Sequence, residues 1–303
     1  MCSNCSKLPA EEDLRAALAN LSRKHTQMAD LLNQTLELAI DEDVPQRAQR
    51  ARELADFLAR IVGGRPVKPG DFPECCLIGQ ESSIGTMSWF CTGVLVHPRV
   101  VLTAGHCVRP PSLAPNVVAL NATNFNDLDG AEIVRVRRTA VHPRYLQTRP
   151  LNDLTVLILR ADARTAPVPM ASSEELARAR RTQLVGFGND DIKSTRGFGT
   201  KREVTVEIAR PLPDELDERE QNWRFESDLE FVAGGAGYDS CNGDSGGPAY
   251  IEVDGARKVA GLTSRAIHGA VNDCGEGGVY TRVDVHRDFI RQTMVDNGIS
   301  GDL

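Results

Sequence analysis

The 303-residue chain lacks the features that mark membrane, exported and nucleic-acid-binding proteins. No stretch approaches the roughly 20 apolar residues that a transmembrane helix needs. Residues 1–7 lack the basic-then-apolar pattern of a secretory signal, so the sequence shows no export route. Lysines and arginines form no run, and the net charge is −7. We therefore expect neither a membrane nor a nucleic acid among the partners.

Patterns that bind metal are also scarce. Cys2 and Cys5 form a C-x-x-C pair, but without a second ligand pair this is weak evidence for zinc. Residues 121–130 are rich in Asn and Asp but lack the EF-hand pattern, which favours a solvated loop over a calcium site. The sequence predicts no metal and no organic cofactor.

The first 60 residues predict a helical hairpin. Apolar residues recur at steps of three, four and seven between Ala10 and Ile40, and the spacing resumes between Gln46 and Ala59. Residues 41–45 are acidic, end in a proline and should break the helix. Two helices alone cannot bury both apolar faces. We expect segment 10–59 to pack on the rest of the chain, on a second copy or on a partner.

Residues 61–303 predict an all-β protein. Apolar runs separated by turn residues are typical of strands in barrels. We expect two six-stranded antiparallel β-barrels, over 61–165 and 180–285, with the active site between them and a closing helix at Asp284–Asp296. The acidic stretch Pro211–Asp228 predicts a solvated surface loop. The predicted strands are Cys91–Val96, Val100–Thr103, Val117–Leu120, Ile133–Val136, Leu154–Leu159, Gln183–Gly186, Glu203–Ile208, Ala249–Val253 and Val259–Leu262.

One stretch, Asp239–Pro248, contains a candidate nucleophile. Ser245 lies between Asp244 and two glycines. A serine hydroxyl is a poor nucleophile unless a nearby base takes its proton. Gly243 has no side chain, so the N–H groups of Gly243 and Ser245 could face the oxygen of a tetrahedral intermediate. A glycine-rich turn without chemistry is the alternative interpretation.

Two upstream motifs favour the chemical interpretation. Thr103–Cys107 contains His106, a candidate general base. Leu151–Leu154 contains Asp153, which would orient the imidazole and stabilise its positively charged form. The order His, Asp, Ser is one of the known orders of the serine-hydrolase triad.

With these motifs, the chain from Ile61 to about Asn297 resembles the trypsin-like (chymotrypsin-fold) serine proteases. The resemblance implies a serine endopeptidase with His106, Asp153 and Ser245 as catalytic residues, and with protein or peptide substrates. The matching stretches, in the family's order, are Ile61–Gly64, Cys91–Val94, Thr103–Cys107, Asn152–Leu154, Gly186–Gly188, Asp239–Pro248 and Gly278–Arg282.

The resemblance also places a specificity pocket. Asp239 would form its floor and favour Lys or Arg before the cut bond, since an unpaired buried charge is costly. Ser240 lies beside it, and Gly277 and Gly278 would leave one wall open.

Two residues depart from the family pattern near this pocket. Arg265 stands where an aromatic residue is usual, and Ala266 where glycine is usual. Arg265 could reach Asp239 and mask it, or face outward and attract acidic residues upstream of the cut. The preceding residue, Ser264, matches a residue that supports the catalytic aspartate, here Asp153.

The resemblance further implies activation by cleavage between Arg60 and Ile61. The freed ammonium of Ile61 would pair with Asp244 in a buried site. Residues 1–60 would then be a pro-segment or a docking module, and 61–303 the protease domain, with a separate activating protease or self-cleavage as the trigger. The alternative is an interaction protein whose helical hairpin is the active part and whose protease body is a scaffold.

Finally, the resemblance implies two disulfides, Cys91–Cys107 and Cys241–Cys274. Another frequent bridge of the family is missing, because Val232 stands where a cysteine is expected. A cytosolic chain with reduced thiols and an exported chain with two bridges both fit the sequence, so the localisation stays open.

Overall fold

The computed structural model describes residues 64–108, 114–209, 216–301 and 303. Contacts divide the chain into two units, Met1–Leu58 and Ala59–Leu303. The described residues all belong to the second unit. The predicted helical hairpin lies outside the described residues, as do Arg60 and Ile61, so what the sequence predicts for them stays a prediction.

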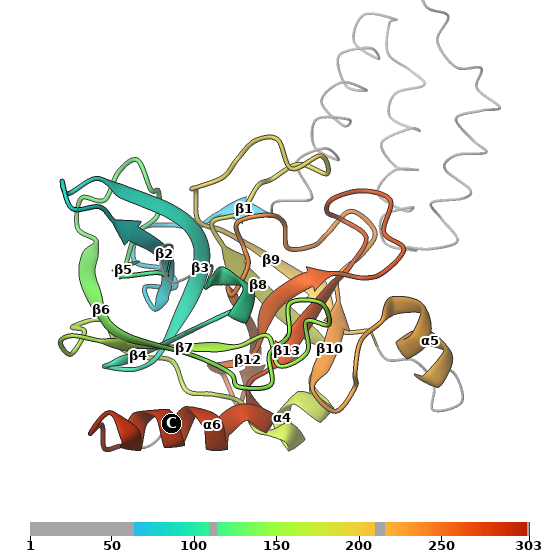
Figure 1. The fold of residues 1–303 in the computed structure, drawn as a ribbon. Coiled ribbons are helices and arrows are strands. Elements are labelled where there is room, and N and C mark those ends of the chain that lie inside the picture. The colour runs from blue at the N-terminus through green and yellow to red at the C-terminus, as the bar shows by residue number, and fades with distance from the viewer. Residues whose placement is uncertain (1–63, 109–113, 210–215, 302) are drawn as a thin grey trace, which may run out of the picture. The chain divides into compact units, whose positions relative to one another are not determined.

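The first half of the described chain is a closed six-stranded antiparallel barrel (Figure 1), as the sequence predicted. Every residue of its strands β4, β5 and β7 is buried, which explains why these strands read as continuous runs of apolar residues and threonine. In spatial order the strands are β2 (Cys75–Glu81), β3 (Met87–His97), β4 (Val100–Thr103), β7 (Thr155–Leu159), β6 (Glu132–Val141) and β5 (Val117–Leu120).

The second half forms a seven-stranded sheet, where the sequence predicted six strands. The extra strand is β1 (Arg65–Pro66), which pairs with β9 at Glu203 and Arg202. The spatial order is β1, β9 (Arg202–Glu207), β8 (Arg181–Gly186), β11 (Pro248–Val253), β12 (Ala256–Ala266), β13 (Gly278–Arg282) and β10 (Glu230–Ala233).

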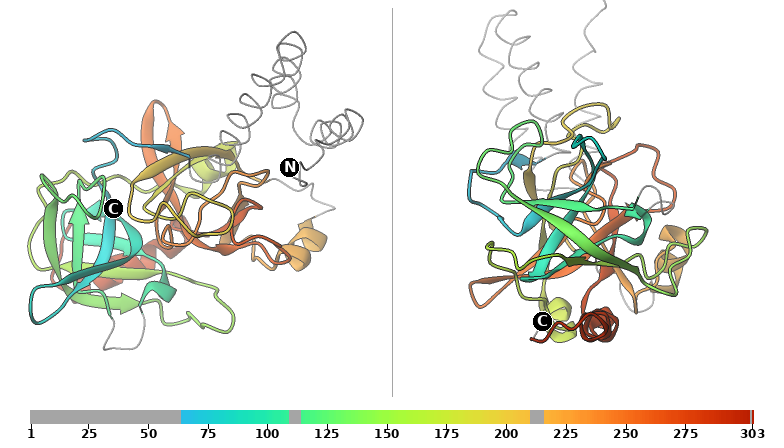
Figure 2. Two further views of the ribbon diagram at one scale, coloured as in Figure 1. Left: turned by 90° about the horizontal axis from the view of Figure 1, so that it is seen from above. Right: turned by 60° about the vertical axis from the view of Figure 1, so that its left-hand side comes forward.

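This second sheet curls until its distant strands meet. Ile208, just after β9, forms an isolated bridge with Ala233 at the end of β10. The N–H of Ala209 donates to the carbonyl of Val232 at 2.8 Å, and Gly234 N–H donates to Glu207 at 3.1 Å. The left view of Figure 2 shows the barrel and the curled sheet side by side.

In the part of the chain that the structure describes, three α-helices accompany the sheets. α4 (Ser173–Arg178) begins with a capping box between Ser172 and Glu175. α6 (Arg287–Asp296) follows a 3-10 turn, η3 (Asp284–His286), and confirms the predicted closing helix. α5 (Leu216–Trp223) lies within Pro211–Asp228, so the prediction of a plain loop there was wrong. The charges that suggested a solvated loop also suit an exposed helix, because neither state needs a wide apolar face.

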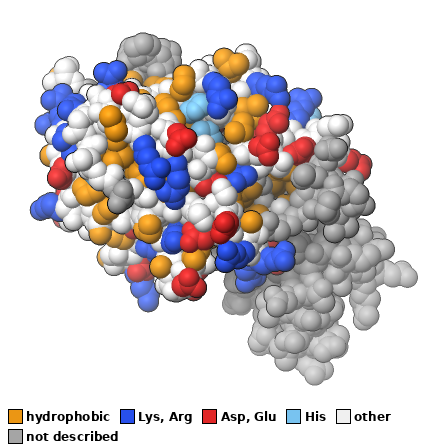
Figure 3. All heavy atoms as spheres, turned by 90° about the horizontal axis from the view of Figure 1, so that it is seen from below, with side chains coloured by type: hydrophobic (Ala, Val, Ile, Leu, Met, Phe, Trp, Pro, Cys, Tyr) orange, Lys and Arg blue, Asp and Glu red, His pale blue; other side chains and the backbone are white. Residues whose placement is uncertain are grey.

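One hydrophobic cluster extends through both halves. It joins Val94 and Leu102 of the barrel to Tyr250 and Leu262 of the curled sheet. This shared core fixes the seam at which the candidate catalytic groups meet. The opposite charges on the face near α4 and α6 are interspersed (Figure 3). Within the described ranges, no helix has the length and hydropathy to cross a bilayer.

Candidate active site

His106 and Asp153 come together because neighbouring strands carry them. His106 lies in a 3-10 turn, η1 (Gly105–Cys107), directly after β4, and Asp153 lies just before β7. Strands β4 and β7 pair at Thr103 and Thr155, so the two adjoining segments meet. The Nδ1 atom of His106 lies 2.8 Å from Oδ2 of Asp153, and the backbone N–H of His106 donates to Oδ1 at 2.9 Å. The carboxylate of Asp153 thus contacts both the backbone and the ring of His106, which orients the imidazole.

The carboxylate of Asp153 also has a partner in the second sheet. The hydroxyl of Ser264, on β12, donates to Oδ2 of Asp153 at 2.6 Å. The side chain of Asp153 is fully buried, whereas 29% of the His106 side chain is exposed. Burial and three donated hydrogen bonds hold the carboxylate in one orientation while leaving the imidazole accessible. The structure therefore places Ser264 behind the candidate triad.

The Ser245 loop is attached to both halves of the fold. The carbonyl of Ser245 accepts a hydrogen bond from the N–H of Thr92 on β3 at 3.0 Å. The next residue, Gly246, has φ +75° and donates its N–H to Thr263 on β12 at 2.8 Å. A Cβ atom on Gly246 would lie 2.1 Å from the hydroxyl of Thr103. Only glycine lets this loop approach so closely the strand that leads to His106.

The backbone from Gly243 to Ser245 provides two hydrogen-bond donors. Gly243 has φ +101°, and its carbonyl accepts a hydrogen bond from the Thr92 hydroxyl at 2.8 Å. A Cβ atom on Gly243 would lie 2.6 Å from the ring of Phe198, so this position requires glycine. Among the described residues, the N–H groups of Gly243 and Ser245 donate to no protein acceptor. They are free to bind an anionic oxygen.

Asp239 lies in a nearly closed site behind this loop. Its side chain accepts hydrogen bonds from Ser240 N–H at 2.7 Å, Gly277 N–H at 3.0 Å and the hydroxyl of Tyr280 at 3.2 Å. Burial raises the pKa of Asp239 to about 7, and these three donors oppose the rise. A Cβ atom on Gly278 would lie 2.9 Å from Oδ1 of Asp239, so glycine is needed there.

No cation pairs with Asp239 among the described residues. Its carboxylate is held by neutral donors, which leaves its charge for a ligand. Tyr280 was not singled out from the sequence, although it belongs to the matched stretch Gly278–Arg282. Its hydroxyl also lies 3.0 Å from that of Ser240, so it braces the floor of the pocket.

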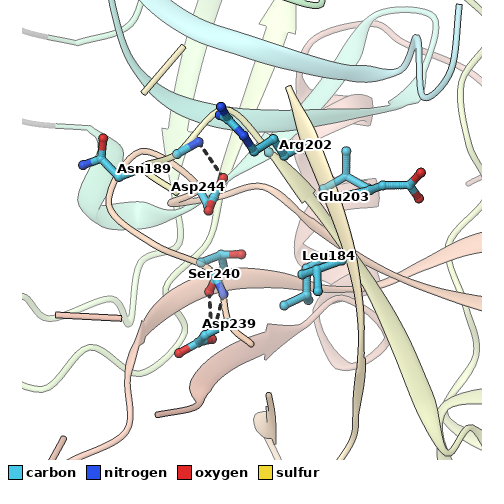
Figure 4. Close-up of a pocket in the computed structure, with 12 residues that line it drawn as sticks. Leu184, Asn189, Arg202, Glu203, Asp239, Ser240 and Asp244 are labelled. Atoms are coloured by element: carbon cyan, nitrogen blue, oxygen red, sulfur yellow. Dashed lines mark hydrogen bonds between the residues drawn. The ribbon is translucent and has the colours of Figure 1, made fainter. Parts of the chain in front are cut away.

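Asp244 is directed away from the solvent. It accepts hydrogen bonds from Gly188 N–H at 2.7 Å and from Cys241 N–H at 2.8 Å. Gly188 and Asp244 line a cavity that also reaches Asp239 (Figure 4). Burial raises the pKa of Asp244 to about 6, against the opposing charge of Arg202. No described residue forms an ion pair with Asp244.

Arg265 does neither of the two things that the sequence suggested. Its guanidinium forks onto the buried carboxylate of Glu230, with Nη1–Oε1 at 2.6 Å and Nη2–Oε2 at 2.9 Å. The alternatives of masking Asp239 or facing outward were therefore wrong. Glu230 gave no signal in the sequence, because it lies 35 residues away in a strand that was not predicted. Ala266 is exposed and lines a groove with Trp223 and Ile267.

Both predicted disulfides, Cys91–Cys107 and Cys241–Cys274, are formed. The first ties β3 to the turn that carries His106, and the second ties the Ser245 loop to the segment before Gly277. Cys75 and Cys76 are buried as free thiols, and burial raises the pKa of Cys75 to about 12. Within the described ranges, no group of three or more His, Cys, Asp or Glu side chains is arranged to hold a metal ion.

A barrel and a curled sheet with histidine, aspartate and serine at their seam define the chymotrypsin-like class of β proteins. The chain belongs to the trypsin family, because the family model described as Trypsin matches residues 61–290. It is 30% identical to mouse tryptase, over 76% of this chain and 87% of that protein.

Two relatives are much longer than the matched region. The serine protease snk of Drosophila melanogaster is 28% identical over 77% of this chain and 56% of its own length. Mouse vitamin K-dependent protein C is 28% identical over 83% of this chain and 56% of its own length. The chain thus spans about half the length of these curated relatives.

Proposed function

We propose that the protein is a serine endopeptidase that cuts after Arg or Lys. The observation that carries this proposal is the contact of His106 with the buried Asp153, beside the Ser245 loop. His106 takes the proton of the Ser245 hydroxyl, and the resulting alkoxide attacks the carbonyl carbon of the peptide. The N–H groups of Gly243 and Ser245 bind the oxyanion. His106 then protonates the leaving amine, and water releases the acyl group by the same steps.

The proposed specificity rests on the buried carboxylate of Asp239. A Lys or Arg side chain that enters this pocket would supply the cation that the described residues do not. Binding of that cation also favours the ionised form of a carboxyl group whose pKa stands at about 7 in the empty pocket.

We also propose that the protein is made as a zymogen. Asp244 accepts two hydrogen bonds but pairs with no described cation. Cleavage at Arg60–Ile61 would free the ammonium group of Ile61, whose positive charge would pair with the carboxylate of Asp244. Because Asp244 adjoins Gly243 and Ser245, a change in its partner acts on both oxyanion donors.

The test compares the uncut protein with protein cut at Ile61, each treated with a fluorophosphonate and assayed on a peptide library. We expect labelling of Ser245 and turnover of Arg and Lys peptides in the cut protein, and neither in Ser245→Ala. An unlabelled cut protein with no turnover would refute the enzyme and leave residues 1–60 as the active part. Cleavage after large apolar residues would refute only the specificity.

A further inference from the structure

Arg265 forms a nearly buried ion pair that the family pattern does not predict. The side chain of Glu230 is fully buried and that of Arg265 is 21% exposed. The two parallel contacts, at 2.6 and 2.9 Å, give this pair the bidentate geometry that only arginine provides. A buried pair is costly to assemble and more costly to break, so its presence beside the active site calls for a role.

The remaining hydrogens of the guanidinium hold two other segments. Nη1 donates to the carbonyl of Pro150 at 3.3 Å, in the loop that leads to Asp153. Nη2 donates to the carbonyl of Arg224 at 2.8 Å, just after α5. Arg265 itself lies on β12. One side chain therefore fastens the Asp153 loop of the first half to two segments of the second half.

The same guanidinium also contacts the hydrogen-bond chain of the candidate triad. Nη1 of Arg265 lies 3.4 Å from the hydroxyl oxygen of Ser264. That hydroxyl gives its single hydrogen to Asp153 at 2.6 Å, so it can offer only lone pairs to Arg265. Both hydrogens of Nη1 are also directed to Glu230 and Pro150, so the contact with Ser264 is long and shared, and Arg265 acts on the bond from Ser264 to Asp153 through its charge. A cation at the start of such a chain strengthens the last bond.

The other charges nearby have their own partners. Arg149 pairs with Glu226 across the groove, and Arg282 pairs with Asp284. Tyr145 lies close to Gly105, and burial together with the charge of Asp153 raises its pKa to about 12, so it stays neutral. Among the described residues, Arg265 is the only cation that contacts Ser264.

We propose that Arg265 is a positioning residue, which with Glu230 holds Ser264 and the Pro150 loop so that Asp153 keeps the orientation His106 needs. This proposal rests on the proposed protease function. It also explains why a cation in this place need not select acidic substrates, since Glu230 neutralises it within the protein.

The experiment uses the cut, full-length protein and measures kcat and KM across the pH range with an Arg-peptide substrate. The acidic limb of kcat, at saturating substrate, reports protonation of the general base in the enzyme–substrate complex, where the cation of the substrate keeps Asp239 ionised. Glu230→Gln leaves an uncompensated positive charge next to Ser264, which disfavours protonated His106 and moves the limb to lower pH. Arg265→Met removes the positive charge and moves the limb to higher pH. Each displacement should be on the order of half a pH unit to one unit.

Three further variants separate charge, geometry and folding. Arg265→Lys keeps the charge without the fork, and should restore the position of the limb but only part of kcat. Arg265→Met with Glu230→Met leaves no buried charge, so it folds without the cost of an unpaired ion. It should keep the limb near that of the parent and lower kcat about tenfold. Arg149→Met is the matched control, because it removes an arginine from the same groove with no contact to Ser264. It should alter KM and leave the limb in place.

The inference is overturned if Glu230→Gln and Arg265→Met move the limb in the same direction or not at all. It is also overturned if the double Met variant retains the full kcat, because the pair would then position nothing. Both outcomes require an active parent protein. A parent with no activity, or an active Ser245→Ala protein, would instead overturn the proposed function.

Discussion

The carboxyl group of Asp244 should affect stability with a sign that depends on cleavage at Ile61. Burial raises its pKa from 3.8 to about 6 in the described fold, where no cation pairs with it. A raised pKa means that the folded chain binds the proton more tightly than the unfolded chain. The resulting stabilisation is complete below about pH 4 and is lost as the pH rises through about 6. About two pKa units correspond to roughly 3 kcal/mol.

The perturbation is Asp244→Asn in an uncut protein that also carries Arg60→Gln and Ser245→Ala. Asn cannot ionise, so it does not lose this stability between pH 4 and pH 8. The difference in unfolding free energy between the Asn variant and its parent should therefore shift by about 3 kcal/mol in favour of Asn over that range. Asp239 titrates in both proteins and cancels. Urea unfolding followed by tryptophan fluorescence reports on the protease domain, because both tryptophans, Trp89 and Trp223, lie in it.

The same substitution should destabilise the cut protein. There the ammonium of Ile61 would pair with Asp244, and removal of one partner of a buried pair costs about 3–5 kcal/mol. The comparison uses Ser245→Ala protein with Arg60 intact, cut by trypsin before unfolding. If the cut protein shows the same shift in favour of Asn between pH 4 and pH 8 as the uncut protein, Ile61 does not pair with Asp244. A difference that does not change with pH would refute the raised pKa.

Four further predictions concern the catalytic residues, the pocket and the Cys241–Cys274 bridge. Ser245→Ala and His106→Ala should each lower kcat/KM for an Arg peptide by about 10⁴-fold or more, with near-normal turnover in either pure variant as the contrary result. Asp239→Ser should shift a peptide-library profile from Arg toward uncharged residues. In the parent, the advantage of Arg over an uncharged residue should shrink as the pH falls through about 7, because protonated Asp239 is neutral; an advantage that does not change with pH would contradict this. Replacing Cys241 and Cys274 by serine should lower the unfolding free energy by about 4 kcal/mol in urea, and unchanged stability would mean that the bridge does not constrain the unfolded chain.

The strands that were predicted best are those that can be recognised from their own residues, without knowing which other segments they contact. Val100–Thr103 and Val117–Leu120 are short runs of apolar residues and threonine in which every residue is buried, and both were predicted with the bounds observed. Strand β2 was missed because its Gly79 and the polar end of Cys75–Glu81 interrupt the apolar run. Strand β10 was missed because it is only four residues long and begins with Glu230. A glutamate indicates exposure until its arginine partner is known.

The residues of the candidate site also divide into those that a local motif predicts and those that depend on a distant partner. Short motifs carry His106, Asp153, Ser245 and Asp239, and each motif could be read locally. The partner of Arg265 could not, because a buried charge is stable only beside its counter-charge and the sequence does not show which residues meet. Sequence reasoning therefore gave two exposed or pocket-facing alternatives for Arg265, and the fold provided a third.

The contacts around the seam also indicate which part of the site responds to activation. Asp153 is held by His106 from the barrel and by Ser264 from the curled sheet, and neither bond involves the loop that carries Asp244. The oxyanion donors, by contrast, flank Asp244 directly. We therefore expect the uncut protein to hold His106 and Asp153 in the described geometry, while its two oxyanion donors are unpaired but not yet fixed in their binding positions. Loss of one oxyanion donor costs about 10²–10³ in rate.

A small fluorophosphonate tests this separation, because its reaction with Ser245 needs the base as well as the oxyanion donors. The uncut protein should react slowly, at about a hundredth of the rate of the cut protein, and His106→Ala should abolish the slow reaction too. The NMR resonance of the His106 ring proton that is hydrogen-bonded to Asp153 should have the same chemical shift in the two forms. If the uncut protein lacks that resonance, cleavage must also rearrange the Asp153 loop, and activation is then not confined to the segment around Asp244.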